Sequence, residues 1–373
     1  MTAAQAPIRT AVVDPSAYTP AYDHALCAAL ARAGASVQLV TSQFAYGDVP
    51  APDGYDVHEL FYRGARGPAG SRARRLSKLA SHASGMRALE KLAADTADIV
   101  HFQWLAMPWL DAGRLPDRPL VLTAHDLLPR EPRPGQARAQ LRLLQRMSAV
   151  VVHSQYGRGQ LVSRLGVPED KVHVIHHGAF EHLAAGAASP LPASLDRVDE
   201  PVVLFFGLLR PYKGVGTLLD AWRGITGAQL WVVGRPMIEM GPLRSAATDS
   251  VRFVDRYVAE HEVQAYFRRA DLIVLPYERT ERFDQSGVLA TALAFGKPVV
   301  LTDIGGFPEI AATGAGRLVE AGDIDGLRDV LQWLIDDPAA RARLGAAARA
   351  AALGPYSWES AATRTLELYR SLL

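Results

Sequence analysis

The most informative stretch of the sequence is Phe205-Phe206-Gly207-Leu208-Leu209-Arg210-Pro211-Tyr212-Lys213-Gly214. An apolar run stops at Gly207, and a loop then presents Arg210 and Lys213 before a helical pattern begins near Gly216. A strand, a tight turn and a helix N-terminus in this order form an anion site, because free backbone N–H groups and the helix dipole favour negative charge. A basic pair after a strand is common in proteins, so the interpretation as a diphosphate site depends on the surrounding sequence.

On both sides of this loop, short apolar runs rich in β-branched residues alternate with helical patterns. The runs that predict buried strands are Ile8–Val13, Val37–Thr41, Ile99–Phe102, Leu120–Thr123, Val150–His153, Val202–Phe206, Leu230–Val233, Val251–Val254, Leu272–Leu275, Pro298–Thr302 and Arg317–Val319. The main helical patterns are Tyr22–Gly34, Ser71–Asp95, Gln136–Met147, Gly157–Leu165 and Ser357–Leu373. This alternation predicts an α/β protein with parallel sheets that are covered by helices.

The chain is long enough for two domains, since 373 residues exceed one ordinary domain. The pattern is interrupted by small residues and prolines with no period, so residues 184–200 are predicted to be a linker. This predicts a first domain over 1–183 and a second over 201–355, both Rossmann-like and doubly wound. Such domains bind ligands at the carboxyl ends of their strands, and we expect these ends to face a shared cleft.

Composition excludes several classes of protein. The 40 basic and 39 acidic residues nearly cancel, which argues against general nucleic-acid binding. The one cysteine, Cys27, lies in an apolar helical pattern, so neither a disulfide framework nor a thiolate metal cluster is expected. No apolar stretch approaches twenty residues and the first residues show no signal-peptide pattern, so we expect a cytoplasmic protein.

Positive charge is concentrated between residues 63 and 91, where the one acidic residue is Glu90. The basic residues are Arg63, Arg66, Arg72, Arg74, Arg75, Lys78, Arg87 and Lys91. One interpretation is a solvated helix face beside a Gly/Pro loop. The other is a docking surface for a phosphorylated acceptor or for anionic lipid, with peripheral contact at the inner membrane face.

The loop after the first strand, Asp14–Pro20, lacks the G-x-G-x-x-G pattern of dinucleotide-binding dehydrogenases. Its polar residues and those of the next helical turn are candidates for an acceptor pocket, and a merely polar loop is the alternative. The candidates are Tyr18, Tyr22, Asp23 and His24.

His125 and Asp126 directly follow the Leu120–Thr123 strand. A His-Asp pair at a strand end is typical of a general base or an oriented polar contact, although a lone histidine is more often structural. His101 has a similar position, but the aromatic residues around it favour a packing role.

A second glycine-containing turn follows the Leu272–Leu275 strand. Ser286 and Gly287 stand at a predicted helix N-terminus, where backbone N–H groups can bind phosphate oxygens. Gly305 and Gly306 form another such turn after the next strand. Together with Arg210 and Lys213, these turns would surround a diphosphate from several sides.

With these motifs in place, the sequence resembles family 4 of the retaining glycosyltransferases over nearly its whole length. The resemblance rests on the Gly207–Gly214 loop, on Ala270–Pro276, on Ala294–Glu309 and on Tyr356–Trp358. It implies the GT-B architecture and transfer of a sugar from a nucleoside diphosphate sugar to an acceptor hydroxyl with retention. It also implies that the final helix, about residues 356–373, crosses back to the first domain.

The resemblance assigns roles to single residues. Arg210 and Lys213 would bind the donor diphosphate, with Gly207 and the backbone of Ser286, Gly287 and Val288 helping. His125 would lie beside the sugar at the reaction centre. Because two cations neutralise the leaving diphosphate, neither a metal nor any other cofactor is expected.

The sequence departs from the family pattern at two positions. Family members often carry two glutamates where this chain has Phe283 and Thr291. Thr291 would hold the nucleotide ribose more weakly, and Phe283 cannot supply the charge that faces the transferred sugar. The departure favours one alternative, a non-catalytic sugar-nucleotide-binding partner subunit. A second alternative is a sugar-nucleotide epimerase of the same fold.

Overall fold

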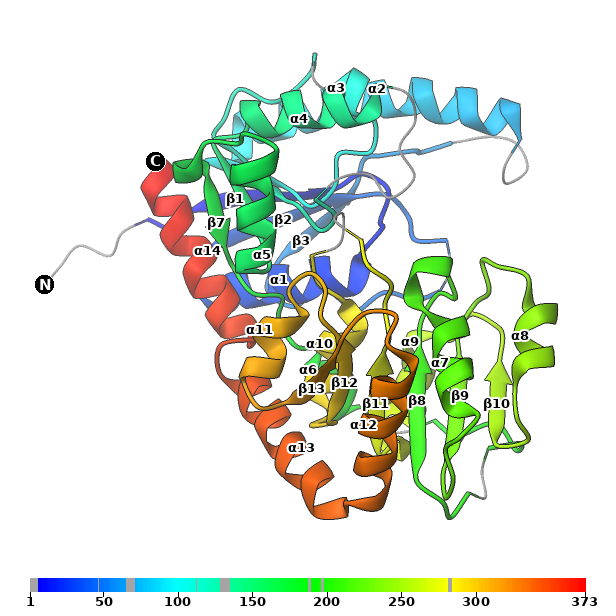
Figure 1. The fold of residues 1–373 in the computed structure, drawn as a ribbon. Coiled ribbons are helices and arrows are strands. Elements are labelled where there is room, and N and C mark those ends of the chain that lie inside the picture. Colours follow the sequence, from blue (N-terminus) through cyan, green and yellow to red (C-terminus); the bar gives the residue numbers. More distant parts are fainter. Residues whose placement is uncertain are drawn as a thin grey trace, which may run out of the picture. The chain divides into compact units, whose positions relative to one another are not determined.

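The computed structural model describes residues 6–45, 47–64, 71–111, 113–127, 135–186, 189–195, 198–280 and 284–373. The side chains of residues 74, 75 and 137 are also outside this description, as are the predictions that concern Arg66 and Phe283. The chain forms two compact units (Figure 1). Unit 1 holds residues up to His176 together with Asp284 and Trp358–Leu373, and unit 2 holds residues 177–280 and 285–357.

Unit 1 contains a parallel sheet in the order β3-β2-β1-β4-β5-β6-β7. Its strands are β1 Arg9–Asp14, β2 Ser36–Thr41, β3 Asp56–Glu59, β4 Ile99–Phe102, β5 Leu120–Thr123, β6 Ala149–Val152 and β7 Val172–Val174. Its helices are α1 Pro20–Arg32, α2 Arg72–Thr96, α3 Pro108–Asp111, α4 Gln136–Arg146, α5 Gln155–Gly159 and α14 Trp358–Leu372. One turn of π-helix, Gln160–Arg164, continues α5.

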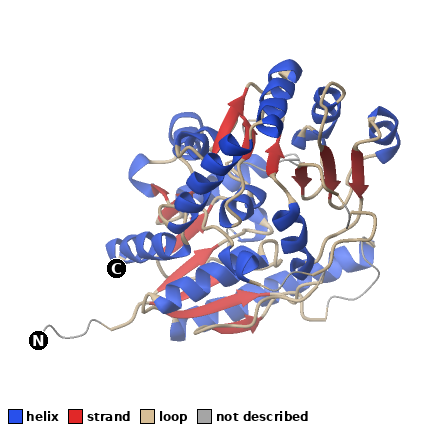
Figure 2. Ribbon diagram, turned by 90° about the horizontal axis from the view of Figure 1, so that it is seen from below, coloured by secondary structure: helices blue, strands red, loops and turns tan. Residues whose placement is uncertain are grey.

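Unit 2 contains a second parallel sheet in the order β10-β9-β8-β11-β12-β13. Its strands are β8 Val202–Phe206, β9 Gln229–Val233, β10 Val251–Val254, β11 Leu272–Leu275, β12 Val299–Thr302 and β13 Gly316–Val319. Its helices are α6 Glu181–Ala185, α7 Val215–Trp222, α8 Met240–Ala246, α9 Glu260–Arg269, α10 Gly287–Ala294, α11 Phe307–Ala312, α12 Ile324–Asp336 and α13 Pro338–Leu353. Figure 2 shows helices alongside the strands of each sheet, so the predicted doubly wound class is confirmed.

The sheets form where the sequence predicts them because their strands are apolar on both faces. Every residue of β4, β5, β6, β11 and β12 is buried, as expected for strands that helices cover on both sides. Two helices of unit 2 begin at aspartate caps. The Asp323 carboxylate accepts the N–H of Gly326 at the start of α12, and Asp337 caps α13 in the same way.

The strand order reverses once in each sheet, between β1 and β4 in unit 1 and between β8 and β11 in unit 2. At such a point the two connections leave in opposite directions, so the carboxyl ends of the central strands stay uncovered by helices. The loops that begin at Asp14 and at Gly207 therefore start at these positions.

The last helix, α14, belongs to unit 1 and packs against α1 (Figure 1). Its Tyr369 is fully buried and its hydroxyl group lies 2.7 Å from Nδ1 of His101 on β4. The segment predicted as a linker, 184–200, falls within unit 2 where it is described, and its first two residues end α6.

Gly214 closes the loop before α7. Its φ is +70°, in the left-handed region that favours glycine, and a Cβ atom there would lie 1.8 Å from the carbonyl oxygen of Pro276. A side chain at this position would push the loop away from the end of β11. Gly214 is therefore required for the loop and for the start of α7.

We predict that Gly214→Ala lowers the free energy of unfolding by about 2 kcal/mol or more, because it combines a left-handed φ with a backbone clash. The matched control is Gly216→Ala on the first turn of the same helix, where a Cβ atom would meet nothing within 4 Å. Alanine there is expected to leave stability unchanged or to raise it by up to about 1 kcal/mol. Urea unfolding of both variants makes the comparison, and equal losses would contradict the role given to Gly214.

Candidate functional site

The loop after β8 brings three of the predicted donor-binding residues together. A Cβ atom on Gly207 would lie 2.9 Å from Nζ of Lys213 and 3.3 Å from Cγ2 of Val288. The φ of Gly207 is +105°, so glycine is required by conformation as well as by space. Lys213 and the first turn of α10 therefore converge on the point where β8 ends.

The ammonium group of Lys213 lies in an aromatic and hydroxyl environment. Lys213 is only 7% exposed, and its Nζ atom lies 5.3 Å from the centre of the Tyr277 ring. The Tyr277 hydroxyl forms a hydrogen bond of 3.1 Å with Oγ of Ser286, the residue that precedes α10. Tyr277 therefore connects the cation to the helix N-terminus, and the quadrupole of its ring favours a positive charge at this distance.

Arg210 is half-buried on the same loop. Within the residues that the structure describes, its guanidinium group forms no ion pair, in contrast to many other arginines of this chain. A guanidinium that is held on a loop and not neutralised by a carboxylate is suited to binding an external anion.

Thr291 is buried on α10, and its hydroxyl donates to the carbonyl of Gly287 one turn earlier. This hydrogen bond uses the donor of Thr291 inside the helix and leaves the oxygen lone pairs as acceptors. A carboxylate at this position would offer more acceptor sites, so the substitution changes the chemistry near the first turn of α10. The other departure, Phe283, is not described.

The glycine turn after β12 is fixed by contacts of Asp303 with residues outside the turn. The Asp303 carboxylate accepts the N–H of Ala321 at 2.9 Å and lies 3.5 Å from the Arg279 guanidinium. Gly305 has a φ of +54°, and the turn leads into the short helix α11. The turn is therefore preformed next to β11.

In unit 1, Asp14 organises the loop that follows β1. Its buried carboxylate accepts backbone N–H groups of Ser16, Tyr18 and Thr19 at 3.1, 2.6 and 3.1 Å. Ala17 within this loop has a φ of +47°, which is strained for a residue with a side chain. The loop is therefore fixed by a carboxylate in place of a glycine-rich turn.

An aromatic stack stands on this loop. The indole of Trp104 lies parallel to the His125 ring at 5.1 Å between centroids, and its N–H donates to Oγ1 of Thr19. Tyr18 is 63% exposed and meets Trp104 edge-on at 5.4 Å. Tyr22 is buried and meets His125 edge-on at 4.6 Å. The structure thus brings Tyr18, Tyr22 and His125 to one place, while the half-buried Asp126 follows His125 in the chain.

Both ring nitrogens of His125 are hydrogen-bonded inside unit 1. Nε2 lies 3.1 Å from Oε1 of Gln103, and Nδ1 lies 3.3 Å from Nε2 of His153. In this arrangement neither nitrogen is available to remove a proton from a substrate. Of the two roles predicted for His125, the structure therefore favours an oriented polar contact over a general base.

The side chains of two predicted acceptor residues, Asp23 and His24, are buried inside unit 1. Asp23 is 1% exposed and its carboxyl group lies 3.4 Å from the Thr19 hydroxyl. Burial, together with the nearby Asp14 carboxylate, raises the pKa of Asp23 well above its usual range. His24 is also buried, with Nδ1 2.6 Å from the Tyr55 hydroxyl. The structure does not bring Asp23 and His24 to the exposed aromatic stack.

Several polar side chains near these loops were not singled out by the sequence. Trp104 is one of the aromatic residues near His101 for which the sequence predicts packing, and His153 is the end of a predicted strand. Asp284 is fully buried in unit 1, where its carboxylate accepts the N–H of His153 at 2.6 Å and the hydroxyl of Ser154. Asp284 lies 131 positions from His153, so no local pattern could connect them.

A buried chain of hydrogen bonds also lies under the loop after β1. The Tyr62 hydroxyl lies 3.0 Å from Nδ1 of His82, and Nε2 of His82 lies 2.5 Å from the Asp111 carboxylate. Tyr62 has a φ of +55°, another strained position. Its partners come from α2 and α3, and sequence alone offered no signal for this cluster.

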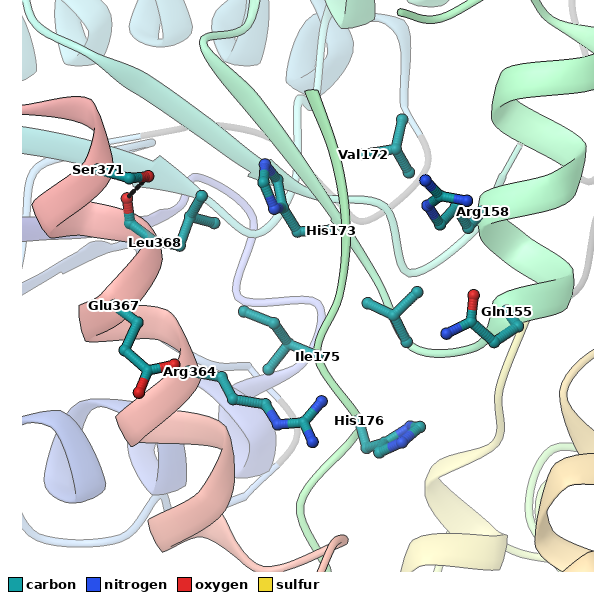
Figure 3. A pocket seen from close by; sticks show the side chains of 11 residues that line it. Gln155, Arg158, Val172, His173, Ile175, His176, Arg364, Glu367, Leu368 and Ser371 are labelled. Carbon is teal, nitrogen blue, oxygen red and sulfur yellow. Dashed lines mark hydrogen bonds between the residues drawn. The ribbon is translucent and has the colours of Figure 1, made fainter. Parts of the chain in front are cut away.

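A pocket of about 830 Å³ lies beside the edge strand β7 (Figure 3). Arg158 and Gln155 of α5 lie on one side of the strand, and Arg364 and Glu367 of α14 lie on the other (Figure 3). None of the residues predicted for the donor or the acceptor lines it.

Within the described residues, no group of three or more histidine, cysteine, aspartate or glutamate side chains is arranged as a metal site. In the part of the chain that the structure describes, no helix is long and apolar enough to cross a membrane.

Comparison with solved structures defines the class. The sucrose-phosphate synthase of Thermosynechococcus elongatus superposes with a TM-score of 0.77 at 22% identity, over 98% of this chain and 99% of that one. Two doubly wound units in series with this similarity define the GT-B fold of glycosyltransferases.

Comparison with sequences defines the family. Residues 22–179 match the model described as Glycosyltransferase Family 4, and residues 200–337 match the one described as Glycosyl transferases group 1. A D-inositol 3-phosphate glycosyltransferase 1 of Catenulispora acidiphila is 31% identical over 313 residues, which cover 74% of this chain and 72% of that protein. The chain belongs to glycosyltransferase family 4, and it is therefore a sugar-transferring enzyme.

A second relative is a GDP-mannose-dependent monoacylated alpha-(1-6)-phosphatidylinositol monomannoside mannosyltransferase of Corynebacterium glutamicum. It is 32% identical over 219 residues, which cover 52% of this chain and 57% of that protein. The match thus spans little more than half of the mannosyltransferase.

His101, the weaker histidine candidate, is buried between Thr123 and Tyr369, and burial lowers its pKa to about 3. Because this pKa lies below that of the unfolded chain, only the unfolded state takes up the proton as pH falls below about 6.5. This contribution to stability is present above pH 6.5 and is lost as pH falls towards 3. His101 is therefore a structural residue.

We predict that His101→Gln reduces stability at pH 7 but makes it less dependent on pH. Between pH 6.5 and 4 the gap to the wild type should shrink by up to about 1.4 kcal/mol per pH unit. Urea unfolding at several pH values measures this, with the exposed His261 replaced by Gln as the control. Parallel pH curves for wild type and His101→Gln would contradict the assignment.

Proposed function

We propose that this enzyme transfers a sugar from a nucleoside diphosphate sugar to an acceptor hydroxyl group, with retention of the anomeric configuration. The observation that carries the proposal is the convergence of Gly207, Lys213 and Val288 at the end of β8. The diphosphate would lie on this loop against the N-terminus of α10, where backbone N–H groups are free of intrahelical partners. Retention is the outcome that membership of family 4 implies.

Charge supports this placement. The leaving nucleoside diphosphate gains negative charge in the transition state, and the cations of Arg210 and Lys213 would stabilise it more than they stabilise the ground state. Lys213 is held in a nearly buried position beside Tyr277, where a charge interaction is weakened less by water. With two such cations in place we propose that the reaction needs no metal ion.

The acceptor would bind at the aromatic stack of unit 1. Tyr18 and Trp104 present exposed or half-buried ring faces, and sugar rings and polyols pack on such faces through their C–H groups. The two relatives are named for a phosphorylated inositol and for a phosphatidylinositol glycolipid. We therefore propose a polyol or glycoside acceptor that carries a phosphate group.

The basic segment between residues 63 and 91 is a candidate site for the phosphate group of the acceptor. On α2, the exposed positions Arg72, Arg87 and Lys91 lie on either side of Leu76 and Leu79, which are 67% and 44% exposed. Leucines between basic residues on one helix are typical of a surface that contacts anionic lipid. We propose that α2 contacts an anionic membrane surface, which would bring the enzyme to a lipid-linked acceptor.

The donor site is tested by calorimetry with the diphosphates of uridine, guanosine, thymidine, adenosine and cytidine. We expect one base to bind best and Lys213→Ala to weaken its binding about tenfold or more, since a charge-assisted hydrogen bond contributes roughly 1.5–3 kcal/mol. Arg210→Ala should have a similar effect.

The matched control is Lys297→Ala. Lys297 also belongs to unit 2, but its ammonium group donates to the carbonyl of Arg268 and is not part of the loop. A variant at Lys213 that binds like wild type would remove this loop from the donor site. Binding of none of the five diphosphates would favour a partner subunit whose donor site was lost through Phe283 and Thr291.

The membrane proposal is tested by flotation with vesicles of neutral phosphatidylcholine and with vesicles that also contain phosphatidylglycerol. We expect binding to the anionic vesicles only, and its loss in a Leu76→Glu, Leu79→Glu double variant. Leu353→Glu is the control, since Leu353 is 58% exposed on α13 of unit 2. Flotation with neither kind of vesicle would favour a soluble phosphorylated acceptor, and equal flotation with both would contradict the role of anionic lipid.

A further inference from the structure

His125 and His153 form a continuous hydrogen-bonded chain at the ends of β5 and β6. Their rings lie 5.2 Å apart, and Nδ1 of His125 lies 3.3 Å from Nε2 of His153. At one end of the chain, Nδ1 of His153 lies 2.9 Å from the backbone carbonyl oxygen of Ile175. At the other end, Nε2 of His125 lies 3.1 Å from Oε1 of Gln103.

With Oε1 of Gln103 facing His125, the number of protons along this chain gives its charge. The oxygens of Ile175 and Gln103 only accept, so each outer ring nitrogen must carry a proton. The contact between the two rings needs one more proton, which gives three ring protons in total. Two neutral imidazoles carry two. We propose that His125 and His153 together hold three ring protons and share one positive charge, and that His153 is a positioning residue that keeps His125 oriented and charged.

The surroundings of the pair favour a cation. The parallel indole of Trp104 offers its ring face to His125 at 5.1 Å. The buried Asp284 carboxylate accepts the backbone N–H of His153 at 2.6 Å, which places a negative charge beside that residue. Negative charge close to a histidine favours its protonated form.

The other titratable groups that face the pair do not oppose this charge. Tyr22 of α1 meets both rings, at 4.6 and 5.5 Å, and burial raises the pKa of its phenol, so it stays neutral. Asp126 follows His125 in the chain. His176 lies with Nδ1 3.1 Å from the backbone oxygen of His153.

The role of this charge depends on the proposed function, the transfer of a sugar from a nucleoside diphosphate. Because both nitrogens of His125 are engaged, the pair offers a fixed charge and not a proton. A fixed positive charge at the reaction centre would stabilise the negative charge that develops on the leaving diphosphate.

The opposite orientation of the Gln103 amide is the competing arrangement. It would direct an N–H of Gln103 at His125 and leave a neutral pair with two ring protons. Gln103 is fully buried, and among the described residues its Nε2 has no hydrogen-bond partner, so burial alone does not select either orientation of the amide. Gln103→Glu separates the two arrangements, because a carboxylate oxygen can only accept.

The experiment is long-range ¹H–¹⁵N NMR of the histidine rings in the free protein from pH 5 to 9, with His125→Asn and His153→Asn used to assign the pair. We expect three protonated nitrogens at pH 7 and loss of the third proton with a midpoint at least about one unit above the ordinary value of 6.5. His153→Asn should return the midpoint of His125 to about 6.5 or below, and Gln103→Glu should leave the wild-type pattern at pH 7 unchanged.

The proposal would be overturned if each ring of the wild type has one unprotonated nitrogen at pH 7 and a third ring proton is present only in Gln103→Glu. The wild-type titration alone decides the point if the glutamate variant does not fold. The measurement needs no donor, so it is independent of the Lys213→Ala calorimetry. In the presence of the diphosphate that binds best, we expect the titration midpoint of the histidine pair to rise by about one more pH unit. An unchanged midpoint would contradict a role of the pair towards the donor.

Discussion

The structure depends on one topological constraint, the reversal of strand order in each parallel sheet. Parallel strands need right-handed crossovers, so helices wound in opposite directions from β1 and β4, or from β8 and β11, leave the ends of these strands uncovered. The loop with Arg210 and Lys213 begins at the end of β8, and the loop with Tyr18 begins at the end of β1. The chemistry follows because backbone N–H groups and short loops are accessible there.

The two units use this position differently. In unit 2, glycines at 207 and 214 let a cationic loop lie against β11 and α10, so positive charge gathers at the strand ends. In unit 1, the Asp14 carboxylate holds a loop without glycine, and aromatic rings stand on it. One unit is thus suited to an anion and the other to a ring with C–H faces and hydroxyl groups. Such a division fits an enzyme that brings two different substrates together.

The fold was predictable from the sequence to within one or two residues at most strands, because buried parallel strands are continuous apolar runs. β4, β5, β8, β10 and β11 have the predicted bounds. The edge strands β3 and β7 were not predicted, since a strand such as Asp56–Glu59 that is covered on fewer sides has no apolar run. The donor loop was also predictable, because Gly207, Arg210 and Lys213 are close neighbours in sequence.

Local pattern thus determined the elements, the glycine turns and the cationic loop, since each depends on residues within one or two turns of the chain. Tertiary structure alone decided that His153 and Gln103 occupy both nitrogens of His125, that Asp284 is buried beside His153, and that Asp23 and His24 point inward. The physical reason is that hydrogen bonds between distant segments depend on which strand ends become neighbours. That order is a property of the whole sheet, and no single stretch of sequence encodes it.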